Sequence, residues 1–196
     1  MSKYLAFLLS IIIINNSCYC QEPALINTAG SNNEINIAKS TDITVAEITG
    51  PQLMETIRKN NKKLNWVILY TSGCSGTQYA IKYANEMVRK FGDSLGVYFL
   101  AGDNLKNIGN VKKVLFKYQT LLPKYIISDS YGTYGDERKK CVKLRDDICR
   151  KCKKDIIGVP YHIVFDKTAE VVFHGFKSYK NTLPEDFITY LMQVTN

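Results

Sequence analysis

Hydrophobic positions follow two different periodicities along this chain, and together they predict a strand-helix-strand order in its centre. The runs Trp66–Tyr70 and Gly96–Leu100 are continuously apolar, as strands are when both of their faces are covered. Between them, apolar residues recur every three or four positions from Tyr79 to Phe91, which predicts an amphipathic helix. Gly92 stands where a residue that follows a helix often adopts a left-handed conformation.

The segments before and after this centre continue the alternation of strands and helices. Ile43–Ile48 alternates between apolar and polar residues, which predicts a half-buried strand. Gly50-Pro51 then opens a helix, because proline fits the first helical turn. Asn110 is expected to cap a further helix, Tyr125–Ile127 is a short strand candidate, and Asp136–Lys154 has the pattern of a charged helix. The expected apolar helix faces are Leu53, Met54 and Ile57, then Val111, Val114, Leu115 and Tyr118, then Cys141, Leu144, Ile148 and Cys152.

The C-terminal part of the sequence predicts a β-hairpin and a closing helix. Tyr161–Phe165 and Val171–Phe173 are apolar strands that a turn over residues 166–169 joins. Pro184 is expected to start the last helix, which carries Phe187, Leu191 and Val194. The order of elements predicts an α/β sandwich with a sheet of mixed strand directions.

The first residues have the pattern of an export signal. Lys3 precedes the apolar run Tyr4–Ile14, which is shorter than the about 20 residues that span a bilayer. Cleavage after Cys20 gives a secreted protein, and a lipoprotein-type cleavage makes Cys18 a lipid-bearing N-terminus and a membrane tether. The predicted organisation is a signal peptide over residues 1–20, a flexible leader over 21–41, and a domain over 42–196.

Composition and charge agree with one globular domain that has no nucleic-acid partner. The 196 residues are 45% hydrophobic and 22% charged, and the formal net charge is +8. The basic residues are spread along the chain, and no aromatic residues interleave with them in a binding array. We therefore expect a solvated basic surface.

Three features in this order carry a resemblance to the thioredoxin superfamily. They are an apolar strand that runs into a turn at Cys74, a Gly-Val-Pro sequence that ends at Pro160 before a hairpin, and a closing helix. Over Asp42–Asn196 the chain resembles exported thioredoxin-like and TlpA-like domains. The resemblance implies a three-layer α/β/α sandwich around a mixed sheet, with a helical insertion around residues 129–155. It also implies a cis Pro160 that faces Cys74, and backbone contacts from Val159 to a bound peptide.

The cysteine turn departs from the pattern of that family. It reads Cys74-Ser75-Gly76-Thr77 instead of Cys-x-x-Cys, Gly73 stands where Trp is common, and no carboxylate lies in Trp66–Tyr70. Cys74 therefore matches the attacking cysteine, Thr77 replaces the resolving cysteine, and Gly73 and Ser75 are expected to contact substrate. A helix start favours the thiolate that attack requires, and we expect Thr77 to donate a hydrogen bond to the sulfur.

The remaining cysteines and the two histidines allow several interpretations. Cys149 and Cys152 form a second Cys-x-x-Cys, which can be a redox pair. One alternative is a structural bridge, either Cys149–Cys152 or Cys141–Cys149. The other is that Cys141 and Cys152 pack as small apolar residues on a buried face. His162 and His174 lack metal-site spacing, so neither a metal nor another cofactor is expected. His162 is expected to be a locally satisfied strand residue, with lining of the thiol site as the alternative, and His174 is expected at the surface.

The function expected from these features is thiol-disulfide exchange in the periplasm or cell envelope. The partners would be exported cysteine-containing proteins or a membrane redox partner. One alternative is a thiol peroxidase, because Ser72-x-Cys74-x-x-Thr77 is similar to the cysteine turn of glutathione peroxidases. The other alternative is a redox-inactive module that uses the fold to hold an extended peptide.

Overall fold

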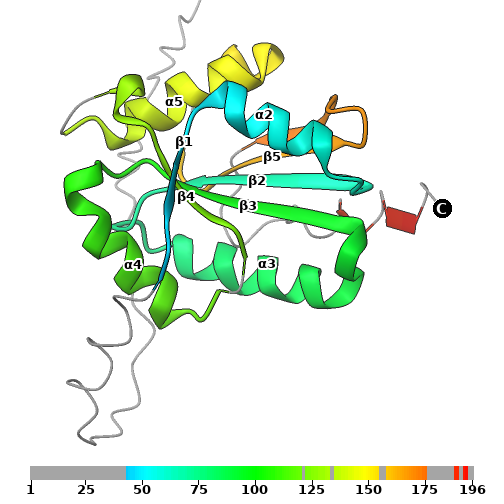
Figure 1. Cartoon of the computed structure of the whole chain (residues 1–196), viewed down its shortest axis with the longest axis horizontal. Coiled ribbons are helices and arrows are strands. Elements are labelled where there is room, and N and C mark those ends of the chain that lie inside the picture. The colour runs from blue at the N-terminus through cyan, green and yellow to red at the C-terminus, as the bar shows by residue number, and fades with distance from the viewer. Residues whose placement is uncertain are drawn as a thin grey trace, which may run out of the picture. The chain divides into compact units, whose positions relative to one another are not determined.

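A computed structural model describes residues 43–120, 122–132, 135–154 and 158–175, together with 188–189 and 192–193. In these ranges, one sheet has the strand order β1-β4-β3-β2-β5-β6 (Figure 1). Neighbours among β1, β4, β3 and β2 are parallel, whereas β5 is antiparallel to β2 and β6 is antiparallel to β5. The strands are β1 (Ala46–Ile48), β2 (Leu64–Tyr70), β3 (Leu95–Ala101), β4 (Lys124–Ile127), β5 (Tyr161–Asp166) and β6 (Val171–Gly175).

Helices cover both faces of this sheet. α2 and α5 lie on one face, and α3 and α4 lie on the other (Figure 1). The predicted three-layer α/β/α sandwich with a mixed sheet is thereby confirmed. The α-helices are α2 (Gly50–Lys59), α3 (Thr77–Phe91), α4 (Ile108–Lys117) and α5 (Glu137–Ile148), and short 3₁₀ helices occupy Gly92–Ser94, Leu105–Asn107, Asp129–Tyr131 and Arg150–Lys154.

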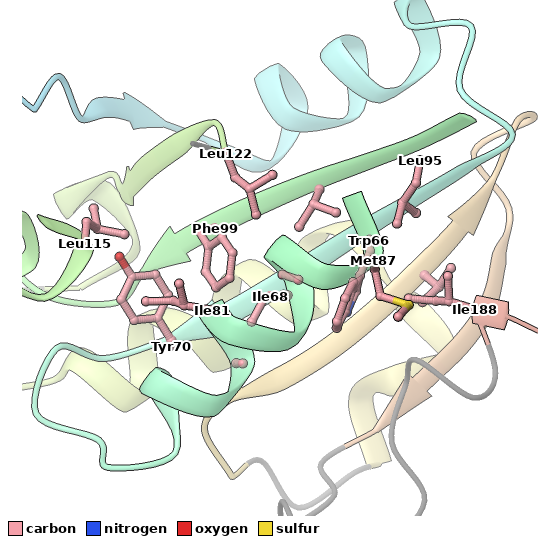
Figure 2. Packing of buried hydrophobic residues seen from close by; sticks show 14 of the residues in the cluster. Trp66, Ile68, Tyr70, Ile81, Met87, Leu95, Phe99, Leu115, Leu122 and Ile188 are labelled. Carbon is pink, nitrogen blue, oxygen red and sulfur yellow. The ribbon is translucent and has the colours of Figure 1, made fainter. Parts of the chain in front are cut away.

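The central strand β2 supplies side chains to two hydrophobic cores. Successive side chains of a strand point to opposite faces, so a strand between two helical layers must be apolar at every position. Trp66 and Ile68 pack under α3, whereas Val67 and Leu69 pack under α2 and α5. Figure 2 shows the first of these cores, with side chains of α3 lying against β2 and β3. Its labelled residues include Ile81, Met87, Phe99, Leu115 and Ile188.

Two predicted helix boundaries are wrong. α4 begins at Ile108, so Asn110 lies inside its first turn and does not cap it. The charged helix ends at Ile148 instead of continuing to residue 154, because Cys149 has a non-helical backbone. A short 3₁₀ helix follows, in which the N–H of Cys152 donates to the carbonyl of Cys149 at 3.0 Å.

The two ends of the predicted domain are only partly described. The first strand is shorter than expected and spans Ala46–Ile48. Residues 1–42, with the predicted signal and leader, lie outside the described residues, as do Phe187, Leu191 and Val194 of the predicted last helix. Ile188 and Met192 are helical and buried in the core under α3.

The end of β3 approaches α5 so closely that only glycine fits there. The N–H of Gly102 donates to the carbonyl of Tyr70 at 2.7 Å. A Cβ on Gly102 would lie 2.5 Å from Cys141 Sγ and 2.5 Å from the carbonyl oxygen of Glu137. This contact fixes α5 against the ends of β2 and β3, beside which the candidate site lies.

Gly102→Ala is expected to lower the free energy of unfolding by about 1–3 kcal/mol, because its methyl group would overpack the contact with α5. Gly109→Ala is the matched control, since nothing lies within 4 Å of a Cβ there and Gly109 is in α4. This control should gain about 0.4–1 kcal/mol. Urea unfolding measures both variants, and equal stabilities would contradict the described packing.

Candidate thiol site

Two distant segments of the chain meet at the end of the sheet. Cys74 Sγ donates a hydrogen bond to the carbonyl oxygen of Val159 at 3.1 Å, and the Val159–Pro160 peptide bond is cis. A Cβ on Gly76 would lie 2.9 Å from Cδ of Pro160 and 3.6 Å from Cys74 Sγ. The turn therefore approaches the Gly-Val-Pro segment at a position where a side chain would clash with the proline ring.

A short hydrogen-bonded turn presents Cys74 in front of α3. The N–H of Cys74 donates to Thr71 O at 3.1 Å, and the N–H of Thr77 donates to Cys74 O at 3.1 Å. α3 begins at Thr77, so the sulfur precedes the first helical turn. Cys74 is half-buried, whereas Gly73 and Ser75 on either side of it are exposed. The cysteine turn is thus exposed to solvent on both sides of Cys74.

The hydroxyl of Thr77 does not donate a hydrogen bond to the sulfur of Cys74. Its hydroxyl donates to Thr71 O at 3.0 Å, and the residue is 1% exposed. A hydroxyl has a single hydrogen to donate, so the predicted donation from Thr77 to the sulfur is wrong. Thr71, which follows β2, thus accepts two hydrogen bonds at its carbonyl oxygen, from the Thr77 hydroxyl and from the N–H of Cys74. The Thr77 hydroxyl therefore links the start of α3 to the end of β2.

Asp103 is a buried carboxylate beside the site that the sequence interpretation missed. It is 5% exposed and follows β3, the strand next to β2. Ser72 donates to it twice, from its N–H at 2.9 Å and from its hydroxyl. The fully buried Lys140 donates to Asp103 O at 2.9 Å and to Asp129 Oδ1 at 2.7 Å. An acidic residue two positions after a buried strand was the available signal, because parallel strands end at one edge of a sheet.

The other described cysteines lie in the core under α2 and α5. Cys149 and Cys152 form a disulfide with a Cα–Cα distance of 5.4 Å, so a bridge from Cys141 to Cys149 is excluded. Cys141 is a free, buried thiol that donates to Tyr70 O at 3.8 Å. Burial, with a smaller effect of the Asp103 charge, raises the pKa of Cys141 to about 12. Within the described ranges, no cluster of three His, Cys, Asp or Glu side chains could hold a metal ion.

A pocket of about 340 Å³ opens beside the thiol. Its walls come from the cysteine turn, from the start of α3 and from the end of α4. Tyr118 donates from its hydroxyl to Gln78 Oε1 at 3.0 Å and closes one side. Sequence periodicity assigned Tyr118 to packing, and it did not indicate Lys117, which also lines this pocket.

His162 lies in β5 but does not line the pocket of Cys74. It is 6% exposed, and its Nδ1 accepts a hydrogen bond from Trp66 Nε1 at 3.2 Å. Burial lowers the pKa of His162 to about 3, so the ring is neutral at physiological pH. The expectation of a locally satisfied strand residue is confirmed. His174 lies in the edge strand β6 and is partly exposed, and its Nδ1 is 3.3 Å from the Tyr161 hydroxyl.

Comparisons with solved structures identify the fold. The thioredoxin domain of a thiol-disulfide oxidoreductase from Bacteroides vulgatus matches with a TM-score of 0.51 and 15% identity, over 72% of this chain and 84% of that chain. A thioredoxin-like protein in its oxidised form matches with a TM-score of 0.53 and 18% identity, over 77% of this chain and 88% of that chain. A further thioredoxin-like superfamily protein matches with a TM-score of 0.50 and 16% identity, over 68% of this chain and 82% of that chain.

These structures define the class to which the domain belongs by its architecture. The chain has a thioredoxin-like fold, as the order of its elements predicted. No protein-family model matches the sequence, and no curated protein matches it significantly.

The burial of His162 predicts a loss of stability in acid. The unfolded state binds a proton near pH 6.5, whereas the folded state does so only near pH 3, so stability is full above pH 6.5 and falls as the pH drops toward 3. At pH 5 the contribution to the free energy of unfolding should be about 2 kcal/mol lower than at pH 8. Urea unfolding between pH 4 and pH 8 measures this slope.

The variant His162→Gln should flatten that part of the pH dependence, because its amide oxygen can still accept from Trp66 without titrating. His174→Gln should keep the slope, because it leaves His162 in place. Equal slopes in the parent and in His162→Gln would refute a buried, neutral His162.

Proposed function

We propose that this protein exchanges disulfides with cysteine-containing proteins through the thiol of Cys74. The observation that carries the proposal is the position of the half-buried Cys74, whose sulfur lies 3.1 Å from the Val159 carbonyl in a solvent-facing turn of a thioredoxin-like fold. The B. vulgatus structure is described as part of a thiol-disulfide oxidoreductase, which supports the same chemistry here. Gly73, Ser75, Val159 and Pro160 would contact the substrate.

The proposed reaction begins with loss of the thiol proton to solvent. The Cys74 thiolate attacks one sulfur of a substrate disulfide, forms a mixed disulfide, and releases the other sulfur as a thiolate that takes up a proton. The mixed disulfide no longer has a hydrogen to donate to Val159 O. That carbonyl is then open to a backbone N–H of the bound substrate, as an extended peptide would offer.

Resolution requires a thiol from outside the cysteine turn. Thr77 has no sulfur, Cys141 is buried, and Cys149 and Cys152 are bonded to each other in the core under α2 and α5. A second thiol, from the substrate or from a membrane redox partner, would attack the mixed disulfide. It would form a new disulfide with the substrate sulfur and return Cys74 as a thiolate.

We further propose that the protein acts outside the cytoplasm, in the periplasm or cell envelope. The apolar run that follows Lys3 supports export, and the Cys149–Cys152 disulfide suits an oxidising compartment. A lipid on Cys18 would tether the domain to the membrane. None of the helices in the described part of the chain is long and apolar enough to cross a bilayer.

Cys74→Ser should abolish reaction with a peptide that carries thionitrobenzoate in a mixed disulfide. The release of coloured thionitrobenzoate measures attack by a protein thiol, and a loss of about 100-fold or more is expected because only the thiolate is a nucleophile. The parent protein carries Cys18→Ser and Cys20→Ser, so that only the described cysteines remain. Cys141→Ala is the matched control and should keep the rate, because that thiol is buried.

Equal rates in the parent and in Cys74→Ser would refute the proposed function. A second assay distinguishes the peroxidase alternative by adding stoichiometric peroxide and trapping a sulfenic acid. Rapid sulfenate formation at Cys74, with no attack on the peptide disulfide, would replace exchange by peroxidase chemistry.

Thr77→Cys should convert the single thiol into a pair that closes on itself. Thr77 is three positions after Cys74, and its N–H already donates to Cys74 O, so a sulfur there lies in the spacing of a Cys-x-x-Cys turn. After mild oxidation, mass spectrometry should show a disulfide between Cys74 and the introduced cysteine, and mixed disulfides with the peptide should no longer accumulate. Thr77→Ser keeps the hydroxyl and should still accumulate them. Persistence of the mixed disulfide in the oxidised Thr77→Cys protein would contradict this geometry.

A further inference from the structure

The pocket beside Cys74 continues along the outer face of α3. A second hollow of about 370 Å³ is lined by α3 and by the end of α4. Gln78 and Tyr118 line both hollows and are joined by a hydrogen bond of 3.0 Å. The two hollows are therefore adjacent, with the Gln78–Tyr118 pair between them, and we call them together the α3 groove, whose first hollow lies beside the thiol.

The side chains that line the α3 groove carry more positive than negative charge. Lys117 lines it beside Cys74, and Lys82 and Arg89 line it farther along, whereas Glu86 is the acidic residue among the lining side chains. The described ion pairs elsewhere join lysines such as Lys59 to carboxylates. No described carboxylate lies within ion-pair distance of the three cations of the groove, so they can meet an external anion.

The length of the groove suits a short extended peptide. Gln78 and Arg89 lie in the same helix and are eleven positions apart, which corresponds to about 16 Å at about 1.5 Å per residue. An extended chain rises by about 3.3 Å per residue, so about five residues span that length. Lys82 and Arg89 would thus lie beside residues close in sequence to the one held at Cys74.

We propose that the α3 groove binds an acidic segment of the substrate, within about five residues of the cysteine that reacts with Cys74. This inference rests on the proposed exchange function and names its substrate class. Asp and Glu side chains of the substrate would pair with Lys82, Arg89 and Lys117. Gln78 and Tyr118 would contact the backbone of the bound peptide. Because these pairs form at the surface, binding weakens as salt screens them.

The test compares two labelled peptides by fluorescence anisotropy on the full chain with Cys74→Ser. Each peptide has a central serine, flanked on both sides by five glutamates in one peptide and by five glutamines in the other. The glutamate peptide should bind about fivefold or more tightly at about 0.05 M salt, and this preference should vanish at about 1 M salt.

The double variant Lys82→Glu/Arg89→Glu should also remove the preference for the acidic peptide. Lys153→Glu/Lys167→Glu changes the net charge by the same amount at exposed positions outside the groove, and it should keep the preference. The proposal is overturned if the parent shows no preference, if the groove variant retains it, or if both double variants lose it equally.

A parallel experiment separates this inference from the proposed exchange. The same peptides with a central cysteine blocked by thionitrobenzoate are added to the protein that retains Cys74. Failure of the glutamine peptide to release thionitrobenzoate would overturn exchange, whereas the anisotropy result decides the α3 groove independently of thiol chemistry. Release from both peptides at the same rate, with equal anisotropy binding, would overturn the groove and leave exchange in place.

Discussion

The close approach of Gly76 to Pro160 is the contact on which the whole site depends. A methyl group on Gly76 would lie within 2.9 Å of the proline ring, so the turn and the Gly-Val-Pro segment meet only because this residue lacks a side chain. The register of the sheet brings them to the same place, since Leu69 near the end of β2 pairs with Tyr161 at the start of β5. In this arrangement the sulfur of Cys74 lies 3.1 Å from the Val159 carbonyl oxygen.

Buried polar groups also fix the cysteine turn to the rest of the domain. Asp103 binds Ser72 through its carboxylate, and the same residue accepts from Lys140 through its backbone carbonyl. A buried ammonium group is costly unless it is paired and hydrogen-bonded, and Lys140 meets this condition through Asp129 and Asp103. Since Lys140 belongs to α5, this helix supports the cysteine turn through Asp103 and Ser72.

Sequence patterns predicted the parts of this arrangement that burial determines. A strand covered on both faces must be apolar throughout, and an amphipathic helix must repeat its apolar residues, so β2, α3 and the β5–β6 hairpin followed from periodicity. The end of α5 did not, because Cys149 leaves the helix while the residues around it keep a helical pattern. The donation from Thr77 to Thr71 could not be read either, because a hydroxyl selects its acceptor from the local backbone geometry. The role of Asp103 depends on β3 lying beside β2, which is a property of the sheet and not of the local sequence.

A cysteine turn with one thiol instead of two changes what determines the release of a bound substrate. In a two-cysteine turn, an internal sulfur ends each mixed disulfide, so the substrate is released by the enzyme itself. Here Thr77 holds that position and is committed to the backbone of Thr71. On the proposed function, the lifetime of the mixed disulfide is then set by access of a second thiol and by the non-covalent contacts of the bound chain. The carbonyl of Val159 and the cation Lys117 of the α3 groove both lie close to the cysteine turn, where such contacts would hold the substrate in place.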